Sequence, residues 1–174
     1  APLEDQLNRK IHESTFTDEL STDPAFNILF RGIKKALELY REENVSLQSE
    51  VAEESQKFVA ISAAQSIEYA GEHFTMQKAA LFLKETEETI RKEVFEKMAN
   101  RRLEDVDKLD SLFNTMLSKR HEIAINAGFK NFRDYKMEAM GRFDYTVSDC
   151  ENFHQSVKTI IVPLVRKIQQ QRLK

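Results

Sequence analysis

The chain has 174 residues and a formal net charge of −3, with 32% charged and 41% hydrophobic residues. This size fits one domain, or one and a part. Basic residues are not in excess, which argues against nucleic acid as a partner, and no apolar run approaches the roughly 20 residues that span a membrane. The single cysteine, Cys150, excludes an internal disulfide, and together with the absence of a signal-peptide pattern it favours the cytoplasm.

Helical patterns dominate the first part of the chain. A helix is predicted over residues 2–13, followed by a polar break. Asp23 followed by Pro24 is typical of a helix start, because Asp caps free N–H groups and Pro fits the first turn. Apolar residues then recur every three or four positions, which predicts a helix from there through about residue 58, with a break near Asn44.

The pattern changes over residues 64–75, where apolar and polar residues alternate about Gly71. This predicts one small β-hairpin, which is the only strand signal in the sequence. Thr75 can cap a short helix through Leu83.

Residues 86–127 contain neither Gly nor Pro and keep a helical period, which predicts one long helix ended by a left-handed cap at Gly128. A short helix then follows Asn131 and ends at Gly141. The expected fold class is therefore mainly α, with long antiparallel helices in a single helical domain over residues 1–174.

Thr146 is placed to open the last helix, in which Pro163 should produce a kink or remove one hydrogen bond. The helix carries an apolar stripe of more than three turns that something must cover. Its members are Val157, Ile160, Ile161, Leu164, Val165 and Ile168.

The sequence holds only incomplete metal motifs. His121 and Glu122 begin the zinc motif His-Glu-x-x-His, but Ile125 stands where the second His belongs, and one imidazole does not make a zinc site. Glu151 and His154 have the spacing used in di-iron bundles, which need a second such pair that this chain lacks. We therefore predict no catalytic residue and no metal ligand here.

Aromatic residues gather in the sequence across the last two predicted helices and the turns beside them. They predict either a small core that fastens the short helix to its neighbours or a wall that receives peptide side chains. Arg142 and Asp144 flank them and can pair with each other, with Arg133 and Asp134, or with a part of the protein outside this chain. The aromatic residues are Phe132, Tyr135, Phe143, Tyr145 and Phe153.

Several short motifs, taken in their order and spacing, resemble the oligoendopeptidase F group within the thimet-oligopeptidase family of zinc metallopeptidases. They are the run from Arg120 to Phe129, Asp134-Tyr135, the run from Gly141 to Thr146, and Val162-Pro163-Leu164. The resemblance implies an all-helical enzyme that closes around a channel and cleaves short peptides. Its zinc and catalytic residues have no matching position in this chain.

The resemblance also implies a role for this chain as the N-terminal, non-catalytic lobe of such an enzyme, inactive alone. It would roof the substrate channel and pack on the catalytic domain of the same polypeptide, with Arg142, Asp144 and Tyr145 as candidate channel-wall residues. In isolation, the chain is expected to form a homodimer that hides the stripe. The alternatives are a free-standing helical adaptor that binds a partner helix on that stripe, and a di-metal oxidase.

Overall fold

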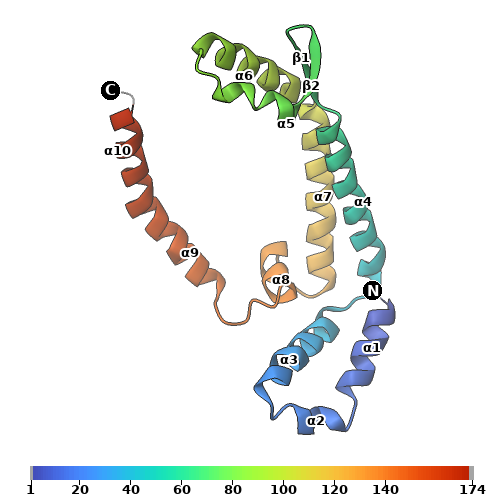
Figure 1. The fold of residues 1–174 in the computed structure, drawn as a ribbon. Coiled ribbons are helices and arrows are strands. Elements are labelled where there is room, and N and C mark those ends of the chain that lie inside the picture. Colours follow the sequence, from blue (N-terminus) through green and yellow to red (C-terminus); the bar gives the residue numbers. More distant parts are fainter. Residues whose placement is uncertain (1, 173–174) are drawn as a thin grey trace. The chain divides into compact units, whose positions relative to one another are not determined.

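A computed structural model of the chain describes residues 2–172 and has the mainly α fold that was predicted, with one two-stranded antiparallel sheet (Figure 1). The chain forms two compact units. The first comprises residues 1–42 and 124–174, and the second comprises residues 43–123. None of the helices in the described part is both long and apolar enough to cross a membrane.

The elements follow one another with short connections. In chain order they are α1 (Pro2–His12), α2 (Phe16–Leu20), α3 (Pro24–Leu39), α4 (Glu43–Ala63), β1 (Ser66–Tyr69), β2 (Glu72–Thr75), α5 (Met76–Ala79), the 3₁₀ turn η1 (Phe82–Lys84), α6 (Glu88–Leu103), α7 (Val106–Asn126), α8 (Phe132–Ala139), α9 (Val147–Ser156), the π-helical turn η2 (Val157–Ile161) and α10 (Val162–Arg172).

Capping residues begin α3 and end α7 where the sequence predicted, whereas α2 lies in the segment where a polar break was expected. The Asp23 carboxylate accepts a hydrogen bond from the Ala25 N–H, with Pro24 in the first turn of α3. Gly128 has a φ of +87°, and the Phe129 N–H donates to the Ala124 carbonyl to close α7. Such a left-handed cap satisfies carbonyl groups that a helix end leaves free.

Arg41 links the ends of two helices within the first unit. Its Nη1 donates to the carbonyls of Glu38 and Tyr40 at 3.0 and 2.6 Å, at the end of α3. Its Nε donates to the Asn126 carbonyl at 3.1 Å, in the last turn of α7. A cation at two helix C-termini is favourable because both ends carry unpaired carbonyls and partial negative charge. The predicted break near Asn44 is confirmed, since α3 ends at Leu39 and α4 begins at Glu43.

The β-hairpin of the second unit is confirmed and provides part of its core. Ala70 and Gly71 form the turn with φ values of +51° and +82°, as a two-residue hairpin turn requires. Ile67 of β1 is 5% exposed and belongs to a buried cluster with Ala79, Val94 and Met98. The short helix after Thr75 ends earlier than predicted, at Ala79, and continues as η1.

The prediction of one helix over residues 86–127 is wrong, because the chain turns between α6 and α7. The turn is held by Asp105, which is 5% exposed. Its carboxylate accepts hydrogen bonds from Gln65 at 3.1 Å, Arg101 at 2.7 Å and Lys108 at 3.1 Å. The Gln65 contact comes from a distant part of the sequence, so no helical period could have revealed the turn.

Replacing Asp105 should alter how stability depends on pH. The hydrogen bonds from Gln65, Arg101 and Lys108 lower the pKa of Asp105 from 3.8 to about 2. The ionised carboxylate therefore stabilises the fold fully above pH 3.8, and this contribution is lost as pH falls through about 2.

We expect Asp105→Asn to lower the urea midpoint clearly above pH 4 and to approach the wild type near pH 2, as followed by circular dichroism. Asp107→Asn, at an exposed position in the first turn of α7, serves as the control and should change little. A deficit for Asp105→Asn that stays constant across this range would contradict the assignment.

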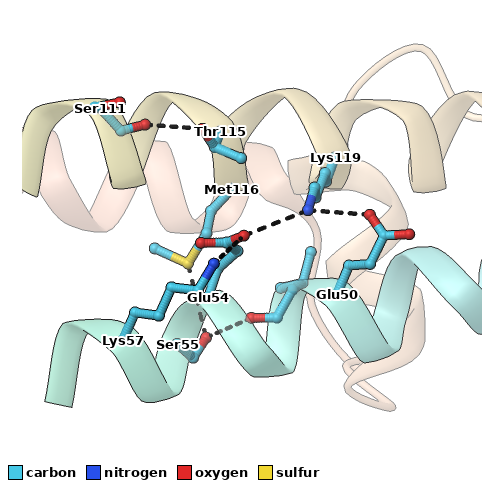
Figure 2. Close-up of polar contacts among 9 residues, drawn as sticks. Glu50, Glu54, Ser55, Lys57, Ser111, Thr115, Met116 and Lys119 are labelled. Carbon is cyan, nitrogen blue, oxygen red and sulfur yellow. Dashed lines mark hydrogen bonds and ion pairs between the residues drawn. The ribbon is translucent and has the colours of Figure 1, made fainter. Parts of the chain in front are cut away.

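Helices α4 and α7 run side by side in the second unit (Figure 2). Lys119 of α7 lies 3.0 Å from Glu50 and 3.6 Å from Glu54 of α4, and the Ser55 hydroxyl donates to the Met116 sulfur at 3.7 Å. Ion pairs that solvent still reaches contribute little stability, so the pairing of α4 and α7 depends mainly on buried α7 side chains. These are Leu112, Met116 and Ile123.

The last three helical elements form one continuous helix that contains a wide turn. A π-helical turn, η2, ends at Ile161, two residues before Pro163. Pro lacks an N–H and its ring clashes with the carbonyl of the preceding turn, and a widened turn relieves both conflicts. The predicted irregularity at Pro163 is therefore confirmed, and it takes the form of this turn.

Candidate functional site

The three residues predicted as a channel wall lie on the loop between α8 and α9, in the first unit. Both ends of the loop are fixed. Gly141, with a φ of +65°, ends α8, and the Arg142 N–H donates to the Met137 carbonyl. Thr146 begins α9 with a capping box, in which its Oγ1 accepts from the Asp149 N–H and the Asp149 carboxylate accepts from the Thr146 N–H. The Thr146 hydroxyl also donates to the Asp149 carboxylate at 2.6 Å, and this bond, followed by that from the Thr146 N–H, lowers the pKa of Asp149 because both favour the ionised form.

Arg31 of α3 holds the middle of this loop. Its guanidinium lies 4.5 Å from the centre of the Phe143 ring, and its Nη1 lies 3.5 Å from the Asp144 carboxylate. A cation over an aromatic face is attracted by the negative charge of the ring surface. Arg31 therefore contacts both Phe143 and Asp144 in the middle of the loop. No sequence pattern indicated this role, because both partners lie more than a hundred residues away from Arg31.

A second contact joins α3 to α8. Lys35 lies 2.6 Å from Glu38 on its own helix and 2.9 Å from Glu138 of α8. The hydrogen bond to Glu38, followed by that to Glu138, raises the pKa of Lys35. Lys35 and Arg31 are one turn apart on α3, so the same face of this helix holds both α8 and the loop.

The candidate wall residues have different surroundings. Asp144 pairs with Arg31, whereas Arg142 donates to the Met137 sulfur at 3.9 Å. Tyr145 is 44% exposed. Arg133 and Asp134, which the sequence offered as partners for Arg142 and Asp144, instead form ion pairs of their own. Arg133 lies 2.9 Å from Asp134 and 3.1 Å from Glu151. The structure thus brings Asp144 to a cation that sequence reasoning missed.

The predicted aromatic cluster divides into separate contacts. Phe132 and Tyr135 are 5.8 Å apart between ring centres, and Tyr135 also contacts Phe129 at 5.7 Å. Phe143 instead faces Arg31, and Phe153 is 67% exposed. The prediction that the five rings form one small core is therefore wrong, because the loop directs Phe143 toward α3 while Phe153 lies on an exposed face of α9.

The described residues do not assemble a metal site. Among residues 2–172, no three His, Cys, Asp or Glu side chains gather where they could hold a metal ion. His121 is exposed on α7, and Glu151 is paired with Arg133. The donor set in this part of the chain therefore does not fit the zinc that the resemblance implies for the whole enzyme.

The apolar stripe on the last helix is exposed to solvent. Two of its members are more than half exposed and three others are 44% to 47% exposed, which is far from the burial expected of large aliphatic side chains in a finished core. The exposed fractions are 66% for Ile160, 47% for Ile161, 53% for Leu164, 44% for Val165 and 44% for Ile168.

These features describe a mainly helical protein with an exposed apolar stripe on its last helix. A sequence model of Peptidase family M3 matches residues 81–174, which is more than half of the chain. The chain therefore belongs to peptidase family M3. No curated protein matches it.

Solved structures share the fold over nearly the whole chain. A structure assigned as an oligoendopeptidase F matches 98% of this chain with a TM-score of 0.90 and 24% identity. An assigned oligoendopeptidase F from Bacillus anthracis str. Ames matches 96% with a TM-score of 0.88 and 26% identity. PZ peptidase A with an inhibitor matches 98% with a TM-score of 0.90 and 24% identity. The chain spans 30% of the length of each of these proteins, and the expected resemblance is confirmed.

Proposed function

We propose that this chain acts as the N-terminal helical lobe of a zinc-dependent oligopeptidase that hydrolyses short peptides. The observation that carries the proposal is the fold likeness, which covers 98% of this chain but 30% of the matched peptidase chain. Family membership supports peptide hydrolysis as the activity of the whole enzyme. The zinc and its ligands would then belong to another part of the same polypeptide, and this lobe alone would be inactive.

Two surfaces support a role at the substrate channel. The exposed stripe on η2 and α10 offers aliphatic side chains that the catalytic domain would cover, because burial of such area is favourable. The α8–α9 loop offers a cation, an anion and a phenol in sequence, at Arg142, Asp144 and Tyr145, which suit contacts with the charged ends and backbone of a short peptide. The lobe would limit substrate size by roofing the channel.

The proposal is tested by an immunoblot of the source cells with an antibody raised against residues 1–174. We expect a band much heavier than 20.3 kDa, and we expect that the precipitated protein cleaves a quenched fluorescent peptide until a zinc chelator is added. The isolated chain should leave the same peptide intact.

The second candidate is a free-standing adaptor that binds a partner helix, which the exposed stripe on α10 favours. A single band at 20.3 kDa without peptidase activity would support the adaptor and overturn the lobe.

A further inference from the structure

A groove runs along one side of the α4–α7 pair, within the second unit. It has a volume of about 460 Å³. Its floor is formed by Leu112 and Met116, which are 8% and 9% exposed, and its two rims carry Phe58 of α4 and Phe113 of α7, which are 50% and 56% exposed. Two phenyl rings that face solvent across an apolar floor are uncommon on a surface that stays uncovered.

The exposed apolar rim of α7 includes a second residue. Leu117, one turn after Phe113, is 51% exposed. Asp110 and Arg120 both line the groove and stand before and after these two apolar residues. Spacings of three and four place all four side chains along one face of the helix.

These residues are arranged symmetrically about one position of α7, with an apolar residue on each side of it and opposite charges further out. Thr115 stands midway between Phe113 and Leu117, and it also stands midway between Asp110 and Arg120. A second α7 that runs antiparallel about a two-fold axis at this position would set each Phe113 against the partner's Leu117. It would also set each Asp110 against the partner's Arg120.

We propose that this groove is filled by a second copy of the chain, so that α4 and α7 of both copies form a two-fold, antiparallel four-helix bundle. The self-complementary charges select this occupant, because an unrelated helix would have to reproduce both charges in opposite order. Arg120 already has an interaction within its own chain, and its guanidinium offers five N–H donors, so it can accommodate the additional carboxylate. The inference does not rest on the proposed peptidase role.

The test is a charge-exchange experiment on the full 174-residue chain, followed by sedimentation velocity at several concentrations. The wild type should sediment as a dimer of 20.3 kDa subunits. Asp110→Arg sets two guanidinium groups against each other across the interface and Arg120→Asp sets two carboxylates against each other, so each variant should raise the dimer Kd by about tenfold or more. The double variant should restore the dimer, and an equimolar mixture of the two single variants should form the heterodimer, in which both pairs are opposite in charge.

Controls separate this interface from the stripe on α10. Leu164→Asp removes any association through the stripe and should leave the dimer through α4 and α7 intact, and circular dichroism should confirm the helix content of every variant. A monomeric wild type would overturn the proposal and assign the groove to another occupant, such as the remainder of a longer polypeptide or an unrelated helix. Dimers that are abolished by Leu164→Asp but unaffected by the charge variants, or a mixture that stays monomeric, would also overturn it.

Discussion

Replacing Val94 with Asp should unfold the second unit, or destabilise it by about 4 kcal/mol or more. Val94 is fully buried and packs in the cluster that joins the β-hairpin to α5 and α6. Its neighbours Ile67, Ala79 and Met98 offer the new carboxylate no side-chain hydrogen-bond donor. The charge must therefore be buried unpaired, or the cluster must open to admit water.

The adjacent residue provides a matched control for this substitution. Phe95 lies on the same helix and is 61% exposed. Phe95→Asp introduces the same carboxylate into solvent, so we expect a change within about 1 kcal/mol. Urea unfolding followed by circular dichroism measures both variants. Equal losses of stability would show that the core is not located where the structure places it.

The second large effect is expected at Asn44, which is 1% exposed on α4. Its Nδ2 donates to the Ile123 carbonyl of α7 at 3.0 Å. Asn44→Asp replaces this donor with a buried, ionised acceptor that faces another oxygen, and we expect a loss of about 3 kcal/mol or more at neutral pH. Asn44→Ala removes the bond without adding a charge and should cost about 1 to 3 kcal/mol.

The pH dependence distinguishes the buried charge from a simple loss of packing. Burial of the new carboxyl would raise its pKa, and its protonated form can donate an O–H to the Ile123 carbonyl. The deficit of Asn44→Asp should therefore shrink as pH falls, whereas that of Asn44→Ala should change little. Asn114→Asp makes the same chemical change at an exposed position of α7 and should be nearly neutral in urea unfolding. A deficit for Asn44→Asp that is independent of pH would argue against a buried carboxyl.

Local signals in the sequence predicted most helix starts and ends. Asp23, Gly128 and Thr146 act through hydrogen bonds or backbone angles within a few residues of themselves, so their roles can be read from neighbouring residues. The hairpin at Gly71 is of the same kind, because its turn and its alternation are local. The order of short motifs also predicted the family, which the match over residues 81–174 establishes.

Contacts between distant parts of the chain decided the remainder. The turn at Asp105 depends on Gln65, and a helical period passes through Leu103 and Leu109 without any break that marks it. The loop at Asp144 depends on Arg31 of α3, and no spacing rule relates these positions. The sequence by itself thus determined where helices begin and end at their caps, while only the tertiary structure decided the turn between α6 and α7 and the surroundings of the candidate wall. The physical reason is that a cap satisfies its own backbone, whereas a buried side chain acquires its partner only when the chain folds.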